Sequence, residues 1–161
     1  MRLKTKSSNM MKTVPVLPIP AKVHGVSLIC RRERRFLLVE RGKEPWKGWL
    51  AFPGGSIEPG ETPEQAAIRE LKEETALDAK ALSHVITVDL ALEGKAYAKS
   101  YYLSVFRANE VSGQEVAGDD AASIHWLTIE EMTTAKVTDS TLEVARSVAE
   151  SEDERPDINP V

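Results

Sequence analysis

The segment from Pro53 to Thr75 constrains the fold of this chain most strongly, because turn signals and helix signals follow one another there without interruption. Pro53-Gly54-Gly55 ends a short apolar run, and Pro59-Gly60 suits the centre of a type II turn, in which proline fixes φ and glycine accepts a positive φ. We therefore expect a short strand before this segment, then a loop, and then a helix.

Several independent signals mark the start of that helix. Thr62 suits the N-cap, Pro63 suits the first helical position, and Glu64 complements the positive end of the helix dipole. Gln65 completes a capping box with Thr62. The pattern predicts a helix that runs to about Thr75.

Three glutamates share one face of the predicted helix. Glu70 lies three residues before Glu73 and four before Glu74, and both spacings place side chains next to one another. Like charges at this spacing destabilise a helix by about 0.2–0.5 kcal/mol per exposed pair. A divalent cation would turn the repulsion into attraction, and carboxylate oxygens suit Mg²⁺ or Mn²⁺. From these residues alone, a metal site and an ordinary solvated acidic face both stay open.

The rest of the chain alternates between strand and turn patterns. Residues 22–30 alternate, residues 36–39 are apolar, and the polar run 31–35 between them predicts a hairpin. The four arginines of that run either grip phosphate or form a solvated turn. Further strands are expected over 82–92, with one shared apolar face, over 96–107 and over 124–127.

Two capping boxes, Thr128-x-x-Glu131 and Ser140-x-x-Glu143, predict two short helices near the end of the domain. Strands and helices alternate irregularly along the chain. This order predicts an α/β fold, a sandwich with a mixed β-sheet.

Composition narrows the class of protein. A length of 161 residues and a hydrophobic content of 42% suit one domain with a buried core. The net charge of −4 argues against general nucleic-acid binding, which needs a basic surface. The sequence has no apolar run of about 18 residues, so we expect no membrane partner. The single cysteine, Cys30, cannot form an internal disulfide, which favours a reducing compartment, the cytoplasm.

The two ends of the chain differ from its middle. We interpret residues 1–20 as a basic, flexible or extended arm, residues 21–150 as the folded domain and residues 151–161 as an acidic tail. Prolines stiffen the arm, which then either crosses to a partner subunit in a homodimer or lies on its own domain.

The helix and the loop before it resemble a known family motif. Gly55, five residues, Glu61, seven residues and the run Arg69-Glu70-Leu71-Lys72-Glu73-Glu74 are similar to the Nudix box, G-x5-E-x7-R-E-U-x-E-E-x-G-U, where U is aliphatic. Leu77 fills the last aliphatic position of this 23-residue pattern. Ala76 departs from the pattern, which has glycine there. Either Ala76 closes the helix in a left-handed conformation, at a cost of about 1–2 kcal/mol, or the helix runs on.

This family includes MutT-like and ADP-ribose pyrophosphatase-like members. The resemblance implies an α/β/α sandwich that hydrolyses a nucleoside diphosphate linked to another group, with Mg²⁺ or Mn²⁺ as cofactor. It also implies that Glu73 or Glu74 orients the attacking water. The implied metal ligands are Glu70, Glu73, Glu74 and the backbone carbonyl of Gly55.

Further roles follow from the same resemblance. Glu61 and Arg69 would hold the loop against the helix. Members of the family often add a catalytic acid from a loop outside the box, and Glu115 is our first candidate, ahead of Asp119 and Asp120 in the same loop.

The substrate follows less directly from the sequence. Gly118-Asp119-Asp120-Ala121, followed by Trp126, looks like the C-terminal half of members that cleave ADP-ribose or a related sugar nucleotide. Nucleoside triphosphates, including oxidised ones, and dinucleoside polyphosphates are alternatives. Trp46, Trp49 and Tyr101 either stack on a base or pack inside the domain.

Other classes of function fit less well. A non-catalytic nucleotide-binding module of this fold would be expected to lack a box glutamate, and all are present here. An isomerase of the same fold would depend on a cysteine, whereas Cys30 lies in a strand pattern and is better explained as core. RNA decapping would need a basic surface.

Overall fold

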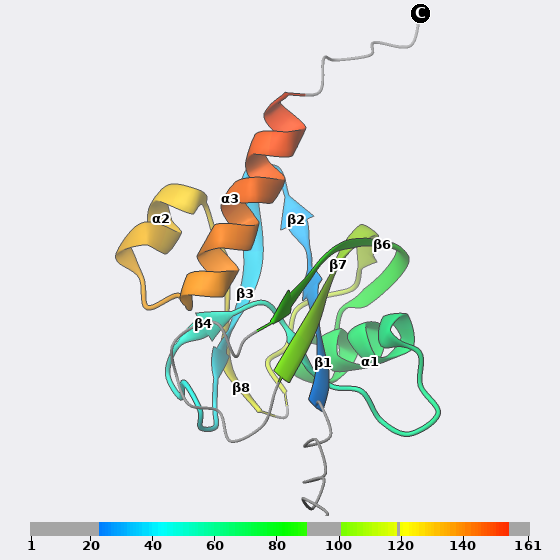
Figure 1. Cartoon of the computed structure of the whole chain (residues 1–161). Coiled ribbons are helices and arrows are strands. Elements are labelled where there is room, and N and C mark those ends of the chain that lie inside the picture. Colours follow the sequence, from blue (N-terminus) through cyan, green and yellow to red (C-terminus); the bar gives the residue numbers. More distant parts are fainter. Residues whose placement is uncertain (1–22, 90–100, 119, 155–161) are drawn as a thin grey trace, which may run out of the picture.

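The computed structural model describes residues 23–89, 101–118 and 120–154, which form eight strands and three helices (Figure 1). In chain order these are β1 Val23–Ile29, β2 Arg31–Arg32, β3 Arg35–Arg41, β4 Leu50–Ala51, β5 Gly54–Ser56, α1 Pro63–Thr75, β6 Asp78–Asp89, β7 Tyr101–Ser112, β8 Ala121–Leu127, α2 Ile129–Thr134 and α3 Asp139–Asp153. The predicted arm and Asp119 lie outside the described residues, so the homodimer interpretation of the arm stays a prediction.

The strands form two sheets of four strands each. In the first sheet, of order β5-β1-β7-β6, β1 is parallel to β7, whereas β5 and β6 are antiparallel to their neighbours. This sheet is therefore mixed, as predicted. In the second sheet, β3 is antiparallel to β2, β4 and β8.

Helices cover the two faces of these strands. Neighbouring residues point to opposite faces of a strand, and Leu28 accordingly belongs to one apolar cluster while Ile29 belongs to the other. α1 packs on the first cluster through Leu71, and α3 packs on the second through Val144 and Ala145. Figure 1 shows α1 apart from α2 and α3, with strands between them. The predicted α/β/α sandwich is confirmed.

The predicted hairpin is confined to β2 and β3. Arg31 pairs with Phe36 and Arg32 with Arg35, and Glu33 adopts a φ of 52° in the turn. β1 does not continue this hairpin, because it pairs in parallel with β7 in the other sheet. The expectation that the whole of 22–30 would pair with 36–39 is therefore wrong: the chain changes sheet next to Cys30.

The expected shared face of the strand over 82–92 is also interrupted. A register shift between His84 and Ile86 gives β6 a bulge. Leu82 consequently packs against the first apolar cluster, whereas Val88 packs against the second. The predicted residues beyond Asp89, and those of the returning strand before Tyr101, lie outside the described part of the chain.

The last two helices differ in how well their starts were predicted. The capping box of α2 is present, with Thr128 and Glu131 bonded reciprocally. α3 begins earlier than the predicted box at Ser140, with Thr138 as its N-cap, and it extends to Asp153, into the predicted tail. Within the described ranges, no helix is both long and apolar enough to cross a membrane.

Candidate active site

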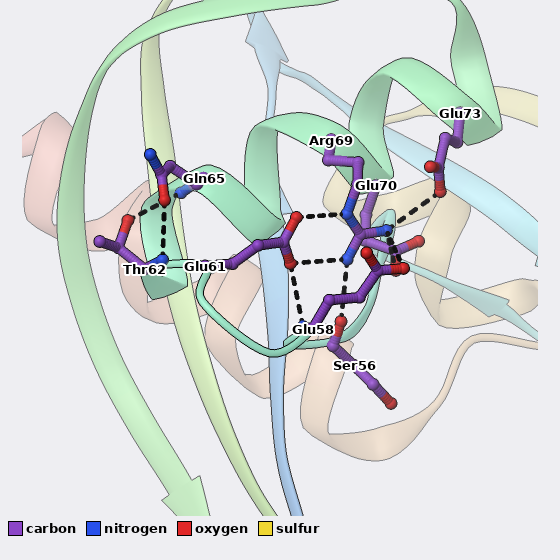
Figure 2. Close-up of polar contacts among 8 residues, drawn as sticks. All are labelled: Ser56, Glu58, Glu61, Thr62, Gln65, Arg69, Glu70 and Glu73. Carbon is purple, nitrogen blue, oxygen red and sulfur yellow. Dashed lines mark hydrogen bonds and ion pairs between the residues drawn. The ribbon is translucent and has the colours of Figure 1, made fainter.

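The helix α1 starts and ends as its local sequence dictates. Thr62 accepts a hydrogen bond from the backbone amide of Gln65, whose side chain accepts one from the amide of Thr62, so the predicted capping box is present (Figure 2). At the other end, Ala76 adopts a left-handed conformation with φ 62° and its amide donates to the carbonyl of Lys72. The alanine thus closes the helix where the box has glycine.

Arg69 ties the preceding loop to α1. Its Nε and Nη2 donate to the two carboxylate oxygens of Glu61 at 2.6 and 3.0 Å, and Nη2 also donates to the carbonyl of Ser56 at 3.0 Å (Figure 2). Its Nη1 donates to Glu70 at 2.9 Å and to Glu73 at 3.1 Å. Glu61 and Arg69 therefore make the loop-to-helix contact that the resemblance implies, and the same guanidinium draws in two of the candidate metal ligands.

The surroundings of Glu74 disfavour the ionised form of its carboxyl group. Burial raises the pKa of Glu74 to about 8, the nearby carboxylates of Glu70 and Asp120 add to the rise, and a hydrogen bond from the Gly54 amide at 2.9 Å opposes it. Burial also raises the pKa of Glu70, against the effect of Arg69. The α1 face thus gathers more carboxyl groups than its neighbours can stabilise in the ionised form.

These two glutamates line a cavity of about 780 Å³. Gly55 lines the same cavity, so three of the four predicted metal-ligand residues lie together there. The volume falls in the range of ligand pockets, about 300–1,000 Å³. Residues of this cavity that the sequence did not single out as site candidates include Glu58, Arg41 and Lys43. The available signal was their charge, because Glu58 lies inside the box and Arg41 and Lys43 precede it.

Two predicted catalytic residues lie elsewhere. The side chain of Glu73 is 42% exposed, bonds to Arg69 and does not line the cavity. Glu115 lines a second, smaller pocket, because Arg32 and the indole Nε1 of Trp126 hold its carboxylate there. The structure therefore does not bring Glu115 together with Glu74.

Of the described acids of that loop, Asp120 is the one at the large cavity. It lines the cavity, pairs with Lys43 at 2.6 Å and lies near enough to Glu74 to raise its pKa. Its carbonyl accepts a hydrogen bond from the amide of Gly42 at 2.7 Å. Among the aromatic candidates, Trp46 and Tyr101 line the cavity, while Trp49 packs edge-on against Trp46.

The residues around Gly55 suit a divalent cation by their chemistry. A side chain at position 55 would place its Cβ 2.3 Å from Oε1 of Glu70, so only glycine lets that carboxylate lie over the backbone. Within the described ranges, no three Asp, Glu, His or Cys side chains converge on one point as they stand, since Arg69 holds Glu70 and Glu73. Oxygen donors and surplus negative charge nevertheless match the preference of Mg²⁺ and Mn²⁺.

Comparison with known proteins agrees with this geometry. A family model described as the NUDIX domain matches residues 21–147. An ADP-ribose pyrophosphatase of Methanocaldococcus jannaschii is 37% identical over 98 residues, which are 60% of this chain and 56% of that protein. An 8-oxo-dGTP diphosphatase of Proteus vulgaris is 32% identical over 93 residues, 56% of this chain and 83% of that protein.

A solved structure shows the same fold. The NUDIX domain of Shewanella oneidensis NrtR, complexed with ADP ribose, superposes with a TM-score of 0.70 at 19% identity, covering 82% of this chain and 89% of that one. At this level of identity the likeness establishes the arrangement of helices and strands.

Proposed function

The chain belongs to the NUDIX domain family, and from this premise we propose that it hydrolyses a diphosphate linkage in a nucleoside diphosphate derivative. The observation that carries the proposal is the surplus of carboxylates at the large cavity, where Glu70 and Glu74 have raised pKa values beside the close approach at Gly55. Such perturbed acids in a cleft are typical of a functional site.

Glu70, Glu73, Glu74 and the carbonyl of Gly55 would hold Mg²⁺ or Mn²⁺. A bound divalent cation would neutralise phosphoryl charge and lower the pKa of a coordinated water. Glu74 would then serve best as the acid that orients the attacking water, because its surroundings raise its pKa and the Gly54 amide fixes its carboxylate. Arg69 holds Glu70 and Glu73 on the helix face, where their carboxylates would serve as ligands of the ion.

The additional acid from outside the box is Asp120 in this proposal. Glu115 was the first candidate from the sequence, but Arg32 and Trp126 already hold its carboxylate in a separate pocket. Asp120 lines the cavity and acts on Glu74. Because a general base has to lie within reach of the water that it deprotonates, geometry favours Asp120.

ADP-ribose or a related sugar nucleotide is the substrate that we favour. Support comes from the archaeal relative named as an ADP-ribose pyrophosphatase and from the ADP ribose bound to the NrtR domain of the same fold. Arg41 and Lys43 give the cavity wall positive charge for a diphosphate, and Trp46 and Tyr101 offer aromatic surface for a base.

Hydrolysis of nucleoside triphosphates, including oxidised ones, is the second candidate, because the Proteus vulgaris relative is named as an 8-oxo-dGTP diphosphatase. A non-catalytic nucleotide-binding role would leave the buried charge of Glu74 without a use. Cys30 is buried and free, in keeping with the cytoplasmic location that we propose.

A hydrolysis panel tests the proposal. The purified chain is incubated with Mg²⁺ and with ADP-ribose, NADH, canonical and oxidised nucleoside triphosphates or diadenosine polyphosphates, and products are identified by mass. We expect AMP and ribose 5-phosphate from ADP-ribose, and loss of turnover when the cation is chelated. Absence of Mg²⁺-dependent hydrolysis across the panel would refute the proposed function.

A further inference from the structure

The loop after β7 is attached to the C-terminal end of α1. The backbone amides of Val116 and Gly118 donate to the carbonyls of Thr75 and Glu74 at 2.9 and 3.1 Å. These carbonyls belong to the last turn of the helix, which has no partners for them within the helix itself. A Cβ at Gly118 would lie 2.6 Å from the carbonyl oxygen of Glu73, so the approach requires glycine. The loop thus follows the catalytic helix closely.

Glu115 fixes the same loop from the opposite side. The guanidinium of Arg32 and Nε1 of Trp126, the latter at 3.0 Å, both donate to Oε1 of Glu115. Arg32 also lies over the Trp126 ring, 4.4 Å from its centroid. Charge-assisted hydrogen bonds and a cation–π contact of this kind hold their partners more firmly than neutral contacts do. In the described loop residues, 113–118, Glu115 makes the side-chain hydrogen bonds and ion pair.

Asp120 is the second residue after this anchored segment. The amide of Ala121 donates to the carbonyl of Gly118 at 3.0 Å, which closes a turn around Asp120. Gly42 and Lys43 then hold Asp120 from the other wall of the cavity. Asp120 is therefore joined on one side to the loop that Glu115 anchors and on the other side to Gly42 and Lys43.

We propose that Glu115 is a positioning residue, which acts on the reaction through Asp120: Arg32 and Trp126 clamp Glu115, and this clamp sets the loop that carries Asp120 into the cavity. The inference rests on the proposed function for its catalytic part. It explains why an acid in this loop is held by two donors away from the cavity. It also assigns Arg32 of the arginine run an indirect role in positioning the loop, although Arg32 itself does not line the large cavity.

A double-mutant cycle separates this role from a catalytic one. We expect Glu115→Ala to lower kcat about tenfold, because a small misplacement of a reacting group is costly, and to leave KM within about twofold. Asp120→Asn should lower kcat about a hundredfold. When both changes are combined, kcat should stay within about twofold of Asp120→Asn alone, since two residues that act through one route are not additive. Glu115→Gln, which keeps an acceptor for Trp126, should recover part of the loss.

The matched control is Glu130→Ala. Glu130 pairs with Arg34 of the same arginine run, but this pair holds α2, and its side chains are 71% and 79% exposed. We expect kcat within about twofold of the wild type. A full additive loss in the Glu115→Ala, Asp120→Asn double variant would overturn the proposal, because Glu115 would then act independently of Asp120.

Amide hydrogen exchange tests the Glu115 contact without any substrate. In Glu115→Ala the amides of Val116 and Gly118 should exchange at least about tenfold faster than in the wild type, and in Glu130→Ala they should not. Equal exchange in both variants would contradict the proposed role of the Glu115 contact. This test is independent of the proposed function, because it can be made even if the protein hydrolyses none of the substrates tested. Faster exchange confined to Glu115→Ala, together with the non-additive cycle, would establish that role.

Discussion

Two arginine-containing regions of this molecule balance their charges in opposite ways. In the run 31–35 each arginine faces one acid: Arg31 pairs with Glu152, which Arg107 also contacts, Arg32 with Glu115, Arg34 with Glu130 and Arg35 with Glu131. In the box, one arginine is shared among several acids: Arg69 with Glu58, Glu61, Glu70 and Glu73. Glu74 adds a further buried acid to the second region.

Under the proposed function, this difference in charge balance separates a structural region from a functional one. Balanced pairs in the arginine run join α2, α3 and the loop after β7 to β2 and β3. Surplus acids on α1 destabilise the domain unless a cation neutralises them. The number of arginines alone could not distinguish the two regions, because guanidinium groups lie near carboxylates in both. The phosphate grip considered for the arginine run loses its support, since all four arginines face acids from their own domain.

The largest expected effect concerns Glu74. Glu74→Gln should lower kcat at least about a hundredfold, because the buried acid is lost from the site. Above about pH 8, where Glu74 is ionised, the same change should also raise the melting temperature of the metal-free protein, because it removes a charge that burial disfavours. Steady-state kinetics and thermal melts check the two halves. Near-normal turnover in Glu74→Gln would show that Glu74 has no part in catalysis.

The second prediction concerns pH. The folded pKa of Glu74, about 8, lies above its ordinary value of 4.5, so between these values the folded state binds more protons than the unfolded state. Stability of the metal-free protein should therefore fall as pH rises from about 5 to 8. At about 1.36 kcal/mol per pKa unit, we expect the melting temperature to drop by roughly 5–10 °C. The drop should be absent in Glu74→Gln.

The acids that pair with the arginine run should change stability with pH in the opposite direction. Backbone hydrogen bonds lower the pKa of Glu115, Glu130 and Glu131, and their arginines add to the effect. Their contribution is complete above the ordinary value of 4.5 and is lost as pH falls below it. Melting curves recorded from pH 3 to 9 should show both signs, and a monotonic rise through pH 8 in metal-free protein would contradict the account of Glu74.

A third, smaller effect is expected inside the arginine run. Glu152 pairs with Arg31 and Arg107, whose side chains are 12% and 31% exposed. Glu152→Ala leaves both guanidinium groups without their acid and should lower the free energy of unfolding by about 2–3 kcal/mol. The exposed pair gives the matched control: Glu130→Ala should cost under about 0.5 kcal/mol. Denaturant titrations that gave equal losses would show that burial does not distinguish these pairs.

The smallest effect is expected at Ala76. This residue has a φ of 62°, which costs alanine about 1–2 kcal/mol but costs glycine little. Because glycine loses more chain entropy on folding, Ala76→Gly should stabilise the protein by about 0.5–1 kcal/mol and leave kcat unchanged. A destabilised variant would mean that the left-handed closure of α1 is not strained.

How well the sequence predicted each element depended on how local its signals are. The bounds of α1 followed from Thr62, Pro63 and Gln65, which act within one turn of the helix. The start of α3 did not follow from its capping pattern. The amide of Thr138 donates to the carbonyl of Leu50, and this distant contact fixes the chain two residues before Ser140.

The same distinction applies to the candidate site. Glu70, Glu74 and Gly55 came from a contiguous motif, and the structure gathers them at one cavity. Which acid of the loop after β7 reaches that cavity depends on Arg32 and on hydrogen bonds to the end of α1. Spacing along the sequence contains no record of either contact, so the sequence interpretation ranked Glu115 ahead of Asp120.

Binding of Mn²⁺ measured by electron paramagnetic resonance tests the central claim most directly. Wild-type protein is titrated beside Glu74→Gln and beside Glu130→Gln, which makes the same chemical change in the arginine run. The account predicts saturable binding to wild type and Glu130→Gln and at least about tenfold weaker binding to Glu74→Gln. Equal affinity in all three proteins would contradict it, because the surplus acids of α1 would then have no part in holding a cation.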